Sequence, residues 1–244
     1  MVEDPGSNPE QPPDLFKRRF RSYRRFDYDR RLLPNRHLAE LEPEGTDLAT
    51  AAASTGLTVG YPAWNLLYYT LFCSPQPDPG VFGPVPPPIG ADLVVVETGT
   101  NLGASTIVMA QALKDLGTEA KVRTVEVNES AVELARRNVD RAGLSDHVEF
   151  HVEDSLVFLS RLVAEVERLD FVFVDDDHRT EHVVKELDII CPHMAPRGKI
   201  YFDNTTGRGV SGALRHLQDK YGGNLIHFPN CSFAPPGNAI WQPG

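Results

Sequence analysis

The sequence predicts an α/β fold: a doubly wound sheet of seven strands, mostly parallel with the last strand antiparallel, behind a helical N-terminal extension. From residue 92 onward, short apolar runs alternate with amphipathic helical stretches, which is the order of β-α units. The first apolar run turns through glycines into a helical stretch. Two further strand-like runs close the chain after the fifth unit. Consecutive β-α units place parallel strands in one sheet with helices on both faces.

Each expected element follows from its composition and hydrophobic period. The expected strands are residues 92–97, 121–127, 147–152, 170–175, 198–203, 224–228 and 238–242. The expected helices of this region are residues 103–116, 129–142, 155–168, 179–194 and 208–221. We therefore expect residues 91–244 to form one ligand-binding domain.

The N-terminal third has a different composition. Residues 1–14 are polar and rich in proline, which predicts a disordered tail. Residues 15–90 are expected to be a helical extension that ends in a Pro/Gly linker and acts as a substrate lid or an oligomer contact. Its best helical segment runs from Tyr61 to Phe72. Residues 17–31 hold eight Lys/Arg and two Asp. They predict either an arm for an anionic surface or, as we favour, an amphipathic segment docked on an acidic protein surface.

Bulk properties narrow the class of protein. A net charge of −10 argues against general nucleic-acid binding. There is no apolar run of about 18 residues that would predict a transmembrane helix. The first residues lack the basic start and apolar core of a signal peptide. The three cysteines have no pattern, as in a reduced cytoplasmic protein. We expect a cytoplasmic protein whose partners are neither nucleic acid nor membrane.

The first strand ends in the sequence Glu97-Thr98-Gly99, and Gly103 follows before the helix. A strand that turns through glycines into a helix N-terminus is typical of a ligand site at the carboxyl edge of a sheet. A carboxylate directly before the turn would repel a diphosphate. It favours a ligand that carries a cationic centre or an amino group.

Two later strand ends extend this ligand site. Glu126 ends the second strand, 27 positions after Gly99, where an acid commonly binds the two hydroxyls of a ribose. The alternative is that Glu126 caps the next helix. After the third strand, Asp154 or Ser155 could bond an adenine amino group, or cap the following helix, or do both. These features fit a dinucleotide or an S-adenosyl nucleoside.

The fourth and fifth strands end in acidic residues. Asp175, Asp203 and Asn204 should meet at the carboxyl edge, because the two strands are expected to be neighbours. Three oxygen donors of this kind predict a binding site for Mg²⁺. The alternative is that such acids are helix caps, Asp177 and its neighbour Asp176 among them. Asp177 or His178 could accept a proton from a substrate hydroxyl at this edge.

These motifs, in this order, resemble a known family. DLVVVETGTNLGAST, TVEVNES, VEDS, LDFVFVDDDH and IYFDN have the spacing of class I S-adenosylmethionine-dependent methyltransferases, over residues 90–244. The chain is most similar to small-molecule O-methyltransferases that use a divalent cation. These are the catechol and caffeoyl-coenzyme-A enzymes and the macrolide- and aminocoumarin-sugar enzymes of antibiotic biosynthesis. The stretch from residue 175 to 204 also resembles the cephalosporin-hydroxylase-related branch. The implied fold is Rossmann-like.

The resemblance implies a role for each matching position. S-adenosylmethionine would be bound by Glu97, Thr98, Gly99, Gly103, Ser105, Glu126, Val127, Asp154, Ser155 and Asp175. Mg²⁺ or another divalent cation would be bound by Asp175, Asp203 and Asn204. His178 stands where the catechol-type enzymes have their lysine base, and Asp177 where the sugar-modifying enzymes have an aspartate base. The choice of base stays open. Asp176 departs from the family, which commonly has glycine there.

The implied reaction is methyl transfer to a hydroxyl of a small molecule, a natural product, sugar or phenol. A homodimer or higher homo-oligomer is compatible with this interpretation. Three alternatives remain: a metal-independent N-methyltransferase, a nicotinamide-dependent oxidoreductase on the same scaffold, and a differently catalytic relative in the cephalosporin-hydroxylase-like branch. The carboxylate at Glu97 and the lack of a G-x-G-x-x-G run disfavour the oxidoreductase.

Overall fold

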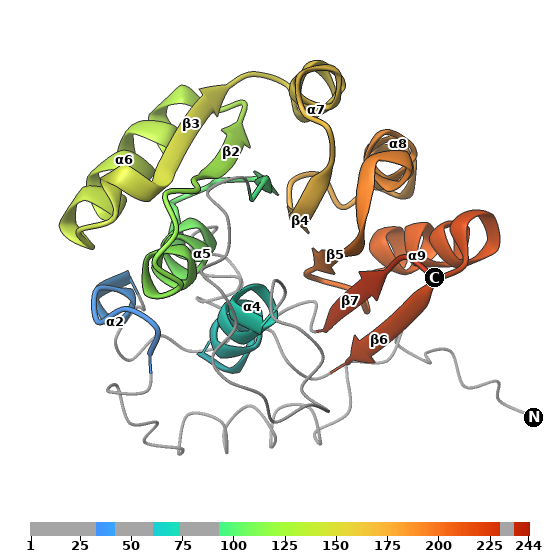
Figure 1. Cartoon of the computed structure of the whole chain (residues 1–244), viewed down its shortest axis with the longest axis horizontal. Coiled ribbons are helices and arrows are strands. Elements are labelled where there is room, and N and C mark those ends of the chain that lie inside the picture. Colours follow the sequence, from blue (N-terminus) through green and yellow to red (C-terminus); the bar gives the residue numbers. More distant parts are fainter. Residues whose placement is uncertain (1–32, 42–60, 74–92, 230–236) are drawn as a thin grey trace, which may run out of the picture.

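A computed structural model describes residues 33–41, 61–73, 93–229 and 237–244 (Figure 1). Within them, seven strands form one sheet in the order β3-β2-β1-β4-β5-β7-β6. The strands are β1 (Val95–Thr98), β2 (Val122–Glu126), β3 (Val148–Val152), β4 (Leu169–Val174), β5 (Met194–Phe202), β6 (Asn224–Phe228) and β7 (Asn238–Gln242). Strands β1 to β5 pair in parallel, whereas β7 lies antiparallel between β5 and β6. The predicted sheet, with an antiparallel last strand, is confirmed.

Helices cover both faces of the sheet (Figure 1). The described helices are α2 (Leu38–Leu41), α4 (Tyr61–Cys73), α5 (Ala104–Asp115), α6 (Glu129–Arg141), α7 (Ser155–Glu165), α8 (Thr180–Ile190) and α9 (Arg208–Tyr221). Side chains of α2, α4, α5 and α6 contribute to one apolar core. Side chains of α7, α8 and α9 contribute to a second core. The order of strands changes direction at β1 and β4, so the loops after these two strands flank the switch point where such sheets bind ligands.

The alternation of side chains along each strand explains the two cores. In β1, Val95 belongs to the core under α4 and α5, and Val96 to the core under α7 and α8. In β4, Phe173 and Val174 divide in the same way. Successive residues of a strand point to opposite faces, so a strand buried on both faces is expected to be mostly apolar. This explains the continuous apolar runs that the sequence contains.

The largest errors in the predicted boundaries lie between α8 and β5. The helix expected over 179–194 ends at Ile190, and a 3-10 turn over Cys191–His193 follows it. Pro192 lacks a backbone N–H and cannot continue the helix. The strand expected to begin at residue 198 therefore begins at Met194, and its pairing with β4 shifts register between Leu169 and Phe171.

The described part of the extension packs on the domain. Helix α4 covers the expected segment Tyr61 to Phe72 and contacts α5. The expected tail at 1–14, the basic segment 17–31 and the linker from residue 74 lie outside the described residues. The role of residues 15–90 as a lid or oligomer contact stays a prediction. Among the described helices, none is long and apolar enough to cross a membrane.

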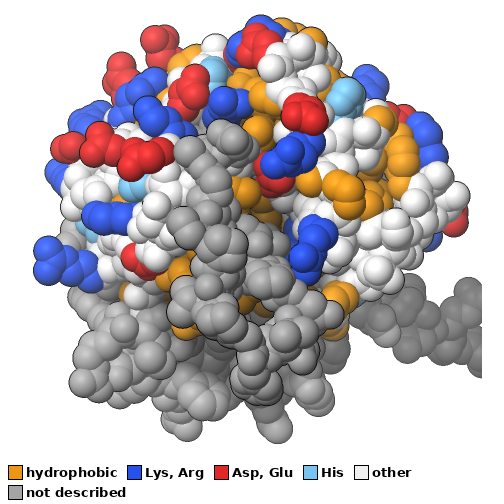
Figure 2. Space-filling view, in the orientation of Figure 1, with side chains coloured by type: hydrophobic (Ala, Val, Ile, Leu, Met, Phe, Trp, Pro, Cys, Tyr) orange, Lys and Arg blue, Asp and Glu red, His pale blue; other side chains and the backbone are white. Residues whose placement is uncertain are grey.

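The surface in Figure 2 carries Lys and Arg side chains interspersed with Asp and Glu, over the residues that the structure describes. Charges of both signs partly cancel one another at the distance of a bound polymer. The described part of this face therefore presents a mixed rather than a uniformly cationic surface.

Candidate active site

The turn after β1 lies against the end of β4. Gly99 has φ +89°, and a Cβ there would lie 2.3 Å from the main-chain oxygen of Asp175. The N–H groups of Gly99 and Thr100 donate to the carbonyl of Val125, at 3.0 and 3.3 Å. Gly103, at φ +82°, precedes α5 without a side-chain cap. The turn therefore requires glycine, and the N–H groups of the first turn of α5 face the same edge of the sheet.

Glu97 is the centre of a buried hydrogen-bond network beneath this turn. Its carboxylate accepts hydrogen bonds from the hydroxyls of Ser105 and Thr106, both at 2.5 Å, and of Thr124 at 2.6 Å. Complete burial raises the pKa of Glu97 to about 7, although the three hydroxyls oppose the shift. The network ties β1, α5 and β2 together. We expected the carboxylate to face a ligand, but it faces these hydroxyls; a contact of Glu97 or Ser105 with a cofactor stays a prediction.

Glu126 joins two loops at the end of β2. One carboxylate oxygen accepts from the N–H of Asn101 at 3.2 Å, and the other from the N–H of Asn128 at 2.9 Å. Helix α6 is capped by the side chain of Asn128, which accepts from Ser130 and Ala131. The alternative that Glu126 caps this helix is therefore wrong. Its partly exposed carboxylate stands at the carboxyl edge, beside the glycine turn.

In the loop after β3, Asp154 caps the following helix, as one of the two interpretations of the sequence predicted. Asp154 is the N-cap of α7, and one of its oxygens accepts from two backbone N–H groups at 3.0 and 3.2 Å. Ser155 is buried, and its hydroxyl lies 3.1 Å from Nε2 of His182. Val127, directly after β2, is 75% exposed. An exposed valine beside a polar edge offers an apolar surface on which a flat ring could pack.

The predicted metal ligands follow paired strand ends. The last residues of β4 and β5 pair with each other, so Asp175 and Asp203 come next on neighbouring strands. The N–H of Asp175 donates to the carbonyl of Thr98 at 3.1 Å. Asp203 is fully buried and accepts from Nδ2 of Asn238 at 2.8 Å. Asn204 is buried at φ +53°, a conformation that asparagine tolerates better than most residues.

The two candidate bases differ in their surroundings. Nε2 of His178 lies 3.3 Å from Oδ1 of Asp175, and this hydrogen bond raises the pKa of His178. The negative charge of Asp203 raises the pKa of His178 further. The His178 side chain is 45% exposed. Asp177 is instead paired with Arg179, whose side chain donates to both of its oxygens. That pairing lowers the pKa of Asp177 to about 2.

Two residues that were not expected from the sequence shape this edge. Asn238, the first residue of β7, donates to Asp203 and so fixes the orientation of its carboxylate. Gly209 in the first turn of α9 leaves no room for a side chain, since a Cβ would lie 1.8 Å from the main-chain oxygen of His178. A glycine within an expected helix was the available signal for this close approach.

The Asp176 side chain contacts helix α8. Arg179 occupies the N-cap position of α8 and no side chain caps that helix, so the capping alternative for Asp176 is wrong. Its carboxylate lies 3.0 Å from Nε2 of His182, and the buried Glu186 completes a group of three potential metal ligands. Glu186 was not identified from the sequence. Its one signal is an acid four residues after a histidine, within an otherwise apolar helix face.

Comparisons with known proteins agree with this architecture. Residues 96–205 match the family described as "Methyltransferase domain". A catechol O-methyltransferase of Niastella koreensis is 32% identical over 131 residues, which cover 50% of this chain and 58% of that protein. A catechol O-methyltransferase of Mycobacterium tuberculosis is 39% identical over 125 residues, covering 51% and 53%. The chain thus spans little more than half the length of these relatives.

Solved structures share the fold. An O-methyltransferase from Bacillus cereus, solved in complex with SAH, superposes with a TM-score of 0.64 at 19% identity. The superposition covers 93% of this chain and 96% of that one. The likeness therefore extends beyond the sheet that the sequence motifs predict.

Proposed function

We propose that this chain is a class I O-methyltransferase, which transfers a methyl group from S-adenosylmethionine to a hydroxyl of a small molecule. The match of residues 96–205 to a methyltransferase domain and the similarity to catechol O-methyltransferases support this proposal. The observation that carries the proposal is that two groups of residues meet at one edge of the sheet. We call the glycine turn after β1 and its neighbours the donor half, and the acidic residues after β4 and β5 the acceptor half. The glycine turn after β1 contacts the main chain of Asp175, which is also the first residue of the acidic edge. A donor on the turn and an acceptor above the acids would then be neighbours.

The donor half has groups that suit each part of the cofactor. The solved Bacillus cereus neighbour holds SAH, the product form of this donor. Glu126 offers a carboxylate for the ribose hydroxyls, in the position where nucleotide-binding sheets have one. Val127 offers an exposed apolar side chain for the adenine ring, and Asp154 keeps one carboxylate oxygen beyond its capping bonds. The open N-terminus of α5 would attract the carboxylate of the methionine part.

The acceptor half has residues that fit a divalent cation. Asp175, Asp203 and Asn204 supply hard oxygen donors, and Asp175 and Asp203 lie close enough to His178 for both to raise its pKa. Concentrated negative charge of this kind suits a cation. A bound Mg²⁺ would act as a Lewis acid that lowers the pKa of the acceptor hydroxyl. Asn238 holds the Asp203 carboxylate in place for this task.

We assign the general base to His178 rather than Asp177. The hydrogen bond to Asp175 orients the imidazole, and the other ring nitrogen is then left to accept a proton from the acceptor. Asp177 is a weak base because its pKa is about 2, and Arg179 occupies both of its oxygens. Asp177 instead holds the loop, since it also accepts from the N–H of Arg179 at 2.9 Å.

The donor half can be tested by calorimetric titration of the full chain with S-adenosylhomocysteine and, separately, NAD. We expect binding of the former only. Glu126→Ala should weaken this affinity by at least about tenfold, since a good hydrogen bond to a charged group contributes about 1.5–3 kcal/mol. Glu133→Gln, an exposed position on α6, is the control and should bind as the wild type. Binding of NAD alone, or equal affinity of the Glu126 variant, would contradict the assignment.

The acceptor half can be tested by following methyl transfer from labelled S-adenosylmethionine to a panel of catechols, phenols, sugars and amines. Methylation of hydroxyl acceptors that stops in EDTA and returns with Mg²⁺ is the expected result. His178→Ala should lose at least about 100-fold in turnover, with little loss of cofactor affinity. Full activity in chelator, or methylation of amines alone, would instead favour the metal-independent N-methyltransferase.

A further inference from the structure

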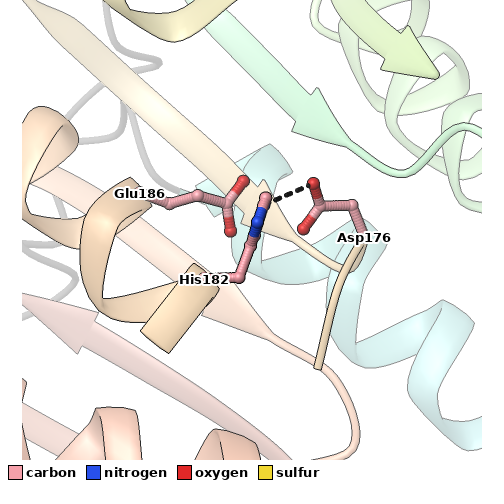
Figure 3. A group of neighbouring side chains, drawn as sticks. All are labelled: Asp176, His182 and Glu186. Atoms are coloured by element: carbon pink, nitrogen blue, oxygen red, sulfur yellow. Dashed lines mark hydrogen bonds and ion pairs between the residues drawn. The ribbon is translucent and has the colours of Figure 1, made fainter. Parts of the chain in front are cut away.

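A second cluster of polar side chains lies beneath the site, on the face of the sheet that α8 covers. Asp176 belongs to the loop between β4 and α8, and His182 and Glu186 lie one turn apart on α8. One ligand atom from each comes within 4.8 Å of the other two, and all three side chains point toward a common centre (Figure 3). The cluster has no part in the proposed methyl transfer.

Glu186 sets this cluster apart from an ordinary surface group of charges. Its side chain is fully buried, yet neither carboxylate oxygen has a well-formed hydrogen bond within the part of the chain that the structure describes. An ionised carboxylate that is buried without a well-formed hydrogen bond is costly, by several kcal/mol. Burial, and next the Asp176 carboxylate, raise the pKa of Glu186 well above its ordinary value, although the nearby Thr98 and Ser155 hydroxyls oppose the shift. A group in this position requires either a proton or a cation.

We propose that Asp176, His182 and Glu186 form a binding site for a divalent transition-metal ion of the Zn²⁺ class. Two carboxylates and a neutral imidazole carry two negative charges, which one such ion would neutralise. An imidazole nitrogen with carboxylate oxygens is a donor set typical of zinc, whereas Mg²⁺ prefers oxygen alone. The ligand set is thus distinct from the oxygen donors Asp175, Asp203 and Asn204.

The surroundings of His182 support this assignment. Its Nε2 atom lies 3.0 Å from Asp176, a few tenths of an ångström less than the roughly 3.3 Å between two ligands on a tetrahedral zinc ion. Its Nδ1 atom faces a carboxylate oxygen of Asp177, and the 3.9 Å between them would have to shorten for a hydrogen bond. Metal-bound histidines usually direct their second ring nitrogen to a carboxylate, which fixes the ring. The Ser155 hydroxyl, 3.1 Å from Nε2, is near enough to serve as, or to hold, a fourth ligand.

Such an ion would connect the loop that carries Asp175, Asp177 and His178 to the body of α8. The loop residue Asp176 lies among these positions in sequence, and its two partners belong to a helix packed in the core. The role is therefore structural: the ion would hold the loop in one conformation. This inference does not depend on the proposed reaction.

The test is a metal titration of the full chain after chelator treatment and dialysis. Zn²⁺ affinity is measured by calorimetry, and Co²⁺ serves as a visible probe through its d–d absorption. We expect an absorption band and tight Zn²⁺ binding in the wild type. His182→Asn and Glu186→Gln, which preserve much of the side-chain size, should lose the band and at least about tenfold in Zn²⁺ affinity. Circular dichroism verifies that each variant is folded.

Three further variants distinguish this site from the predicted oxygen site and from metal binding elsewhere on the chain. Asp203→Asn alters the predicted oxygen site and should keep the Co²⁺ band, as should Glu181→Gln and His193→Gln outside the cluster. Equal Zn²⁺ affinity in the wild type, His182→Asn and Glu186→Gln would overturn the proposal. So would a band that disappears only in Asp203→Asn. A cluster held by a shared proton would bind no Zn²⁺ in any of these proteins, and that result would overturn the proposal as well.

Discussion

At the scale of the residue, Glu97 should make stability depend on pH. Its pKa is about 7 in the folded chain, against 4.5 ordinarily, so the folded state holds the proton more tightly. The stabilisation is present below pH 4.5 and is lost as pH rises through 7. Between pH 5 and pH 8 the free energy of unfolding should fall by about 2–3 kcal/mol more in the wild type than in Glu97→Gln.

Urea unfolding of both proteins at the two pH values measures this difference. Glutamine has nearly the same shape. Its amide oxygen can accept from the hydroxyls on one side, and its amide N–H can donate to a rotated hydroxyl on the other, so the variant removes the titration and can keep most of the network. Glu133→Gln, at an exposed position, is the control and should follow the wild type at each pH. Parallel pH profiles for the wild type and Glu97→Gln would show that Glu97 does not titrate in this range.

Residues at strand ends could be identified from the sequence, but the direction of their side chains could not. The sequence places Asp175 and Asp203 at one edge, because parallel strands end together. It does not reveal that Glu97 faces three hydroxyls, since Ser105, Thr106 and Thr124 come from two other elements. A charge beside a glycine turn can face a ligand or the interior, and only the packing of the neighbouring helix decides.

At the scale of the element, Asp188 connects α8 to α9. One carboxylate oxygen lies 2.8 Å from Lys220 Nζ and 3.0 Å from both His216 Nε2 and Tyr221 Oη. Burial acts to raise the pKa of Asp188, but these hydrogen bonds, first that of Lys220, lower it to about 2. The resulting stability is present above the unfolded value of 3.8 and is lost as pH falls toward 2.

Asp188→Asn should therefore destabilise the chain by about 1 kcal/mol at neutral pH, a modest effect because the group is partly exposed and screened by water. The difference from wild type should shrink as the pH falls from 4 to 2. Unfolding in urea across this range measures it. Asp219→Asn, exposed on α9, is the matched control. An Asp188 variant as stable as the wild type at pH 7 would contradict the role of this contact between the helices.

Element types were predictable because the period of apolar residues differs between helix and strand. The residues at which elements begin and end were less predictable. Helix α8 ends at Ile190, before the expected boundary at residue 194, because Pro192 has no backbone N–H to continue the helix. The cluster of Asp176, His182 and Glu186 joins a loop to a helix face, and its members could be related only once α8 was placed against β4.

At the scale of the whole molecule, α4 belongs to the core rather than to its surface. Trp64, Leu67 and Leu71 are buried in the cluster that also contains α5 and the sheet. The hydroxyl of Tyr201 on β5 donates to the carbonyl of Ala63 at 3.4 Å. A helix that contributes side chains to a shared core should unfold together with the sheet, since cooperative units follow contiguous packing.

This cooperativity can be measured through Trp64. Trp64→Ala leaves a large cavity and should cost about 3–5 kcal/mol in urea unfolding, in one transition seen equally by circular dichroism and by fluorescence of Trp241. The indole N–H of Trp64 is buried without a hydrogen-bond partner among the described residues. Trp64→Phe loses that unsatisfied donor along with some volume, so it should cost only about 1–2 kcal/mol.

If Trp64→Ala changed stability by less than Trp64→Phe, or unfolded in two transitions, α4 would be a separate unit. In that case a lid that moves independently of the sheet would become the better description of the extension. A single shared transition would instead show that α4 is a fixed part of the domain core.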